Sequence, residues 1–301
     1  MPPRHVAAAV LTAVIWGTNF VAIRESLDVF PPLLLVALRF AVIAVPVVLF
    51  VPRPDVEPRW LVGYGLGFGT LHYAGLYLGM DGGVPAGLAS LVLQSSAPFS
   101  VVLGALLLRE VITPVRATGV AIAVGGLALV GVSRASAGDW APYLLVILGG
   151  LGWALGNLAG RKAQAPNGLH LMLWMTVVPP LPLLALSLLT EGPDEIADAL
   201  SASLTADAAP AWLGLGYTVV LGTVVGAAIW TWLMGTHPVS TVAPFSMLVP
   251  VTGLLAGWLV LHERPTGLEL AGGALVVAGV LVASRSQAPA PAAAPKPALV
   301  D

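Results

Sequence analysis

Long apolar segments follow one another along almost the whole chain. A helix that crosses a membrane needs about 20 mostly apolar residues, and ten segments of that kind can be read between residues 6 and 284. They are 6–23, 31–51, 60–79, 83–108, 114–133, 141–158, 169–189, 211–234, 238–261 and 267–284. Because most connectors between them are short, we predict an all-α integral membrane protein with ten transmembrane helices in one bundle.

Part of this pattern occurs twice. Residues 104–126 match residues 257–279 at a constant offset of 153, with nine identities in twenty-three positions. The identities include Glu110 with Glu263, so they are not only a product of apolar composition. An internal repeat of this kind decides the architecture.

The repeat divides the predicted bundle into two halves of five helices. We place the first half in residues 1–137 and the second in 138–286, followed by a disordered Pro/Ala-rich tail, 287–301. The front of each half agrees weakly, with Trp16 matching Trp153 at an offset of 137. Five is an odd number, so the second half must enter the membrane in the opposite sense. Inverted repeats place a binding site near the midplane and allow alternating access, although a duplicated scaffold or a static pore is the alternative.

The distribution of Lys and Arg predicts the orientation. With the N-terminus in the cytoplasm, the inner segments hold nine basic residues and the outer segments hold three. The connector 191–210 contains five carboxylates and no basic residue, and it would lie outside. The positive-inside rule therefore places both termini in the cytoplasm.

Composition narrows the class of protein further. The chain is 57% apolar and 9% charged, with a mean hydropathy of +0.92, whereas a soluble domain carries about a quarter charged residues. The net charge of −2 offers no basic surface for nucleic acid, and the absence of cysteine excludes disulfides and thiolate metal sites. The run after His5 is long enough to span a membrane, so we expect no cleavable signal peptide.

Enzyme motifs are missing from the sequence. No Gly-Lys pair forms a P-loop, and neither H-E-x-x-H nor G-x-S-x-G occurs. We therefore predict no catalytic residue, no metal site and no cofactor. A membrane enzyme is the weaker alternative, as is a scaffold or receptor that transports nothing.

Polar residues inside the first and sixth apolar segments are candidates for the binding site. Trp16 and Asn19 are three residues apart, and Trp153 and Asn157 are four apart, so each pair shares a helix face. An amide within the hydrocarbon region needs a partner. Either a ligand or a neighbouring helix can supply it.

Arg39 is the charged residue that lies well inside an apolar segment. Eight residues from Pro31 at 1.5 Å each place it roughly 12 Å deep, near the middle of a core about 30 Å thick. An arginine there costs at least ~2.5 kcal/mol and usually faces a cavity or a partner. It could hold a substrate carboxylate, or it could reach the interface or bind carbonyls as a structural lock.

Three further segments contribute candidates. The third holds His72, Tyr73 and Tyr77, whose aromatic faces suit an ammonium or an apolar group, although Tyr77 could belong to an interfacial belt. The fourth holds Gln94 before Pro98, and interior prolines there and in the ninth segment suggest moving, cavity-lining helices. The eighth adds Tyr217, Thr223 and Trp230, and of these we select Tyr217 and Trp230 as candidates for substrate binding.

Several long motifs carry a resemblance to a known family. WGTNFVAI at 16–23, PPLLLVALRF at 31–40, PAGLASLVLQ at 85–94 and VAPFSMLVPV at 242–251 resemble the EamA branch of the drug/metabolite transporter superfamily. The match covers residues 6–284, and within that branch it is most similar to bacterial exporters of cysteine and O-acetylserine. The resemblance implies efflux across the inner membrane through a central cavity between inverted halves.

These observations give one expected mechanism. A small zwitterionic metabolite, an amino acid or a derivative, enters at the midplane; Arg39 or a half-helix N-terminus receives its carboxylate, and aromatic side chains face its ammonium. The predicted partners are this small molecule and membrane lipid, without nucleic acid. A homodimer and a different neutral metabolite or drug as substrate are left open.

Overall fold

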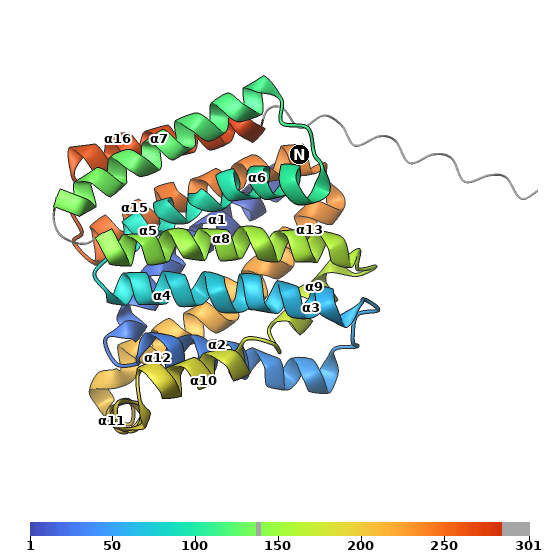
Figure 1. Ribbon diagram of the computed structural model, residues 1–301. Coiled ribbons are helices and arrows are strands. Elements are labelled where there is room, and N and C mark those ends of the chain that lie inside the picture. Colours follow the sequence, from blue (N-terminus) through green and yellow to red (C-terminus); the bar gives the residue numbers. More distant parts are fainter. Residues whose placement is uncertain (137–139, 285–301) are drawn as a thin grey trace, which may run out of the picture.

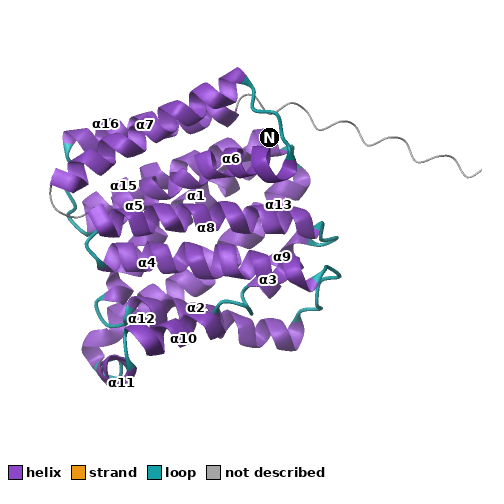
Figure 2. Cartoon of the chain, in the orientation of Figure 1, coloured by secondary structure: helices purple, strands orange, loops and turns teal. Residues whose placement is uncertain are grey.

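The computed structural model describes residues 1–136 and 140–284, and the regular structure in these ranges is helical (Figures 1 and 2). In chain order the helices are α1 (Pro3–Leu27), α2 (Pro32–Phe50), α3 (Pro58–Tyr64), η1 (Gly65–His72), α4 (Tyr73–Asp81), α5 (Ala86–Val92), η2 (Leu93–Ser95), α6 (Ser96–Leu108), α7 (Pro114–Ser136), α8 (Trp140–Ala163), α9 (Gly168–Met175), α10 (Pro180–Thr190), α11 (Pro193–Ala202), η3 (Ala206–Ala208), α12 (Ala209–Tyr217), η4 (Thr218–Val225), α13 (Gly226–Thr236), α14 (Val239–Val242), η5 (Ala243–Met247), α15 (Leu248–Val260) and α16 (Gly267–Ser284). The predicted tail and the predicted boundary between the halves lie outside the described residues.

Nine helical stretches among the described residues are long and apolar enough to cross a membrane. They coincide with nine of the ten predicted segments, which confirms an all-helical, multi-pass membrane protein. The remaining predicted segment, 60–79, is helical as α3, η1 and α4 but is not one of the nine. Its glycines, tyrosines and His72 lower its mean hydropathy. The segment can carry these residues because it lies largely inside the protein rather than against lipid.

Two helices contain a π-helical stretch at matching places. η1 covers Gly65–His72 and η4 covers Thr218–Val225, and both ends differ by the repeat offset of 153. The identities Tyr64 with Tyr217 and Thr70 with Thr223 occur at the same offset. The repeat therefore extends further towards the N-terminus than the segment 104–126, and it includes an unusual backbone geometry that is frequent at functional sites.

Two helical stretches with interior prolines, α5–η2–α6 and α14–η5–α15, tighten into 3₁₀ turns near these prolines. The stretch before Pro98 tightens into the 3₁₀ turn η2, and Pro244 lies within the 3₁₀ segment η5. Proline lacks an N–H and crowds the preceding turn, so the α-helical hydrogen-bond pattern is interrupted there. Both helices consequently have a local point at which they can bend.

α7 and α16 lie side by side along one edge of the bundle (Figure 1). Their closest approach is made by glycines that the repeat matches: a β-carbon on Gly119 would lie 2.6 Å from the carbonyl oxygen of Gly279, and one on Gly126 would lie 2.5 Å from that of Gly272. Each of these two contacts is the image of the other under the offset of 153. Small residues let the two backbones approach closely in a lipid environment.

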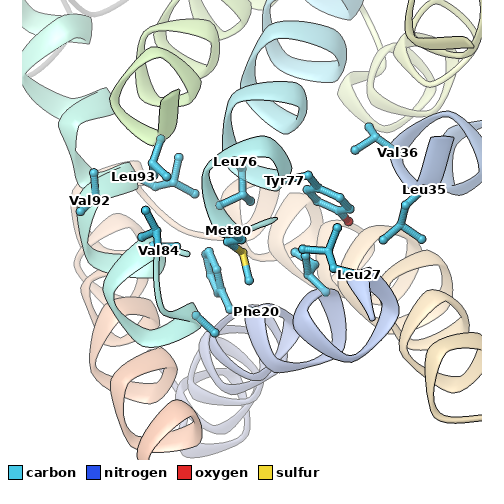
Figure 3. Packing of buried hydrophobic residues seen from close by; sticks show 14 of the residues in the cluster. Phe20, Leu27, Leu35, Val36, Leu76, Tyr77, Met80, Val84, Val92 and Leu93 are labelled. Atoms are coloured by element: carbon cyan, nitrogen blue, oxygen red, sulfur yellow. The ribbon is translucent and has the colours of Figure 1, made fainter. Parts of the chain in front are cut away.

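Helices of one half pack on helices of the other. α1 packs against α12, α13 and α15, whereas α8 packs against α3, η1, α4 and α6. The main hydrophobic core includes residues of α1, α2 and α4, as Figure 3 shows for Phe20, Leu35 and Leu76. Because the halves interlock, residues far apart in sequence meet at the centre.

The connector 191–210 contains a helix that the sequence pattern did not predict. α11 has Asp194 and Glu195 in its first turn, where acidic side chains favour the helix dipole. Glu191, just before it, accepts hydrogen bonds from the amides of Leu33 (2.6 Å) and Leu34 (3.1 Å) at the start of α2. The carboxylate thus joins the end of α10 to the start of α2.

Candidate functional site

Arg39 is buried, with 1% of its surface exposed. Its guanidinium donates hydrogen bonds to the hydroxyl of Tyr77 (2.9 Å), to that of Tyr73 (3.2 Å), and to Thr223 Oγ1 from Nη2 (2.8 Å) and Nε (3.3 Å). The guanidinium carbon also lies 4.2 Å from the centre of the Tyr73 ring, within cation–π range. Three helical segments therefore hold one cation in place.

Among the residues that the structure describes, no carboxylate forms an ion pair with Arg39. Within the part of the chain that the structure describes, the ion pairs involve Arg24, Arg59, Arg116 and Arg161, all with acidic residues near helix ends, and none involves Arg39. Neutral hydroxyls satisfy hydrogen bonds but leave the net charge. A buried cation held in this way is suited to receive an anionic group.

Thr223 owes its position to the π-helical stretch. Its hydroxyl donates to the carbonyl of Thr218, five residues earlier, at 2.8 Å, and its lone pairs then face Arg39. Its counterpart Thr70 likewise faces the carbonyl of Gly65, at 3.4 Å. The sequence analysis named Thr223 in the eighth segment but did not select it as a substrate-binding residue. The Gly-Thr pairs at 69–70 and 222–223, which match at the repeat offset, were the signal that could have identified it.

An aromatic cluster continues from Arg39 towards α8. The Tyr73 ring lies 4.4 Å from the His72 ring and 5.8 Å from that of Phe68, and Trp153 lies 5.0 Å from His72 and 5.7 Å from Phe68. Tyr73, Phe68 and Trp153 are half-buried, so part of each ring is accessible. Phe68, which the sequence analysis did not select, completes this wall.

His72 is held more tightly than its neighbours. It is 3% exposed, and its Nδ1 lies 3.2 Å from the carbonyl oxygen of Gly149 on α8. A β-carbon on Gly152 would lie 2.5 Å from the amide nitrogen of His72, so the two helices are in close backbone contact. In this structure His72 joins η1 to α8 behind the accessible faces of Tyr73 and Trp153.

Trp16 and Asn19 lie beside Gly222, and Trp230 packs on Trp16. The rings of Trp16 and Trp230 are 5.2 Å apart, and Trp16 Nε1 donates to the carbonyl of Gly222 at 3.0 Å. The Oδ1 atom of Asn19 is buried and has no hydrogen-bond partner. Because Gly222 precedes Thr223, Trp16 and Asn19 adjoin the turn that holds Arg39.

Gln94 lies where the two proline-bearing helices meet. Its Nε2 atom is 3.4 Å from the sulfur of Met247. Gln94 and Met247 are themselves separated by 153 residues, so matching positions of the two halves touch each other.

Two predicted residues lie apart from this group. Tyr217 bonds through its hydroxyl to Thr18 Oγ1 (2.6 Å) and to the carbonyl of Ile15 (3.2 Å), beside a groove of about 380 Å³ between α1, α12 and α15. Asn157 is exposed. Within the described residues, no hydrogen bond or ring contact joins either residue to Arg39, Tyr73 or Tyr77. No three His, Asp or Glu side chains of the described residues gather as a metal site would require.

The two sides of the site differ in packing. Residues 90–95, in the first half of the fourth predicted segment, are all buried, whereas their counterparts at the offset of 153, residues 243–248, are half-buried or exposed. The first stretch packs against α15, α1 and α8. The site is therefore covered on the side of α5 and η2 and less covered on the side of η5.

Comparison with known proteins adds to this geometry. A family model described as the EamA-like transporter family matches residues 4–132 and 140–285. The chain is 38% identical over 281 residues to a probable amino-acid metabolite efflux pump of Salmonella typhimurium, covering 91% of this chain and 92% of that protein. A protein of the same description from Escherichia coli is 36% identical with the same coverage.

A more distant relative and one solved structure were also found. A probable terminal-alkyne amino-acid exporter of Streptantibioticus cattleyicolor is 30% identical over 294 residues, covering 94% of each chain. The crystal structure of another protein matches the fold with a TM-score of 0.60 at 20% sequence identity, and the match covers 94% of this chain and 98% of that one. At that identity, the structural match supports the shared fold alone.

Proposed function

Because the chain belongs to the EamA-like transporter family, we propose that it exports amino-acid metabolites across the inner membrane as a secondary transporter. Two relatives bear the description of amino-acid metabolite efflux pumps, and a third that of an amino-acid exporter. Membership in a transporter family agrees with the prediction that the protein is not an enzyme. The structure then suggests which part of the substrate is recognised.

The observation that carries this proposal is the buried, unbalanced charge of Arg39. A guanidinium presents a planar fork of N–H donors that matches a carboxylate in a bidentate way. In the described structure, hydroxyls of Tyr73, Tyr77 and Thr223 hold the fork without neutralising it. A substrate carboxylate would supply the missing charge and would be worth most at this depth, where water does not compete.

The rest of an amino-acid substrate has partners nearby. The accessible faces of Tyr73 and Trp153 suit an ammonium group or an apolar side chain. The unpaired Oδ1 of Asn19 offers a second acceptor for an ammonium group. A site with one cation, aromatic faces and few other charges favours a small zwitterion over a polyanion, and it also favours amino acids with apolar side chains.

We assign the chain ten transmembrane helices in two inverted repeats of five. The image-related contacts of α7 with α16, and of Gln94 with Met247, support a twofold relation between the halves. The tenth span is the segment 58–81, whose low hydropathy reflects its role in lining the site. With the termini in the cytoplasm, the less covered side is the cytoplasmic one, from which an exporter loads its substrate.

Untargeted analysis of exported metabolites tests this function. The medium of cells that overproduce the protein is compared with that of cells that lack it, and we expect one or a few amino-acid-related compounds to accumulate outside in the first case. No change in any small metabolite would overturn the proposal and would favour the scaffold alternative.

A further inference from the structure

Glu263 connects the end of α15 to the start of α5. Its carboxylate accepts hydrogen bonds from the amides of Ala86 (2.6 Å) and Gly87 (2.9 Å), the first two residues of that helix. Free N–H groups and the positive end of the helix dipole make this a favourable place for a carboxylate. The contact closes the side of the protein on which α5 begins, which we term the α5 side.

Glu110 occupies the same place in the other half, and its backbone has the same form. Arg109 and His262, the residues before the two glutamates, both have a left-handed φ of 57°. The amide of Glu110 donates to the carbonyl of Gly104 at 3.2 Å, and that of Glu263 donates to the carbonyl of Gly257 at 3.1 Å. Matching residues thus form matching corners at opposite sides of the membrane.

The carboxylates of the two corners nevertheless have different partners. Glu110 pairs with Arg161, at the end of α8 (2.5 Å), and with Arg116 (3.7 Å). Its side chain is 28% exposed. One corner therefore holds its carboxylate on a helix start, and the other holds it on arginines.

The partner that each glutamate lacks is present at the matching position. Ala86 and Gly87 follow Pro85, and at the offset of 153 the amides of residues 239 and 240 follow Pro238 at the start of α14. Arg161 matches Arg24 of α1 at the offset of 137. In this structure Arg24 pairs with Asp28 at 3.0 Å near the surface, so it can change partner at little cost.

From this we infer that Glu110 and Glu263 are alternating latches that set which side of the transporter is closed. In the present state Glu263 holds the start of α5 and Glu110 rests on Arg161. In the other state Glu263 moves to Arg24, and Glu110 binds the first amides of α14. Each state keeps one carboxylate on a helix start and one on an arginine, so the exchange loses neither kind of contact. The extra contact of Glu110 with Arg116 has no equivalent for Glu263, because the counterpart of Arg116 is Glu269.

The inference rests on the proposed alternating access, and the natural absence of cysteine allows a direct test. Two single-cysteine reporters are matched by the repeat: Ser90→Cys lies in the covered stretch, with 2% exposure, and Ala243→Cys lies at the half-buried counterpart. N-ethylmaleimide reacts with a thiol only where water reaches it, so its reaction rate at each reporter measures the population of the state in which that reporter is accessible.

Opposite shifts are the expected result. Glu263→Gln weakens the latch on the α5 side, so labelling at Ser90→Cys rises about tenfold and labelling at Ala243→Cys falls, since a hydrogen bond to a charged group carries about that factor. Glu110→Gln weakens the other latch and lowers labelling at Ser90→Cys by a similar factor. Equal shifts in the same direction, or no shift with either variant, would overturn the inference, because a merely structural role affects both states alike.

Glu191→Gln is the matched control. It also removes a carboxylate from two amides at a helix start, those of Leu33 and Leu34. The helix that matches α2 in the other half, α9, needs no such carboxylate, because its own Asn167 side chain accepts from the amides of residues 169 and 170. Glu191 therefore has no alternating counterpart. We therefore expect stability to fall without a change in the labelling ratio. Labelling needs no substrate: if wild type exports nothing while the opposite shifts occur, the proposed function fails and the latch stands, and if export occurs without the shifts, the latch alone fails.

Discussion

Replacing Thr223 by valine removes one hydroxyl from the Arg39 site and leaves the shape of the side chain nearly unchanged. The oxygen accepts two hydrogen bonds from the guanidinium, at 2.8 and 3.3 Å. Hydrogen bonds to charged groups contribute about 1.5–3 kcal/mol each, and the pair is not additive. We take about 2 kcal/mol for the loss in correct positioning of Arg39, which is a factor of roughly 30.

The assay is the initial rate of efflux of the exported metabolite, loaded as a labelled compound into cells or proteoliposomes. We expect Thr223→Val to lower this rate about 30-fold at subsaturating substrate. Thr70→Val is the control because Thr70 faces the matching π-helical carbonyl, that of Gly65, but does not touch Arg39. Its expected effect is no more than about threefold, the size of one weak surface-type hydrogen bond.

Two outcomes would refute this reasoning. If both valine variants lose efflux equally, the hydroxyls serve only the π-helical backbone. If neither loses efflux, Arg39 does not depend on Thr223 for its function. Elution of both variants as folded protein in detergent is needed before either result is read.

Two further predictions concern packing and the extent of the site. Gly126→Val should lower the thermal unfolding temperature in detergent, because its β-carbon would lie 2.5 Å from the carbonyl oxygen of Gly272. Gly125→Val should leave that temperature unchanged, because its β-carbon meets nothing within 4 Å. Equal effects of the two variants would refute the close helix contact. In efflux assays Trp153→Ala should reduce transport at least about tenfold, because the aromatic cluster beside His72 is lost. Asn157→Ala, at an exposed position, should leave transport within about twofold of wild type. A larger effect of Asn157→Ala than of Trp153→Ala would show that the site lies on the other face of α8.

The architecture was predictable because a membrane imposes a strong constraint on sequence. Apolar runs of about 20 residues mark helices whatever their neighbours are, and nine of the ten predicted segments recur as long apolar helices. The helix α11 was missed because its short amphipathic pattern lies in an acidic connector that the same rule reads only as a loop.

The candidate site was predictable only in part. A deep arginine and a Tyr-rich helix are visible in the sequence, and the structure joins Arg39 with Tyr73 and Tyr77. Local sequence gives little sign of a π-helical turn, so the partner Thr223 was not selected. Spacing places Asn157 near the face of Trp153, but packing by α3 and α4 decides which part of that face is covered.

The state of the protein was beyond sequence analysis for a physical reason. In the proposed alternating-access cycle, two matched halves give two states of similar contacts, and the sequence does not say which one is occupied. In the structure, the contacts of Glu110 and Glu263 and the burial of residues 90–95 relative to 243–248 distinguish them.

The most direct test of the central claim is the carboxylate requirement of efflux in wild type and in Arg39→Gln. The exported amino acid, its carboxamide and its decarboxylated amine are compared in the same transport assay. We predict that wild type exports the acid at least about tenfold faster than either analogue and that Arg39→Gln loses this preference together with most of its efflux. Unchanged efflux of the acid by a folded Arg39→Gln variant would contradict the proposed role of Arg39.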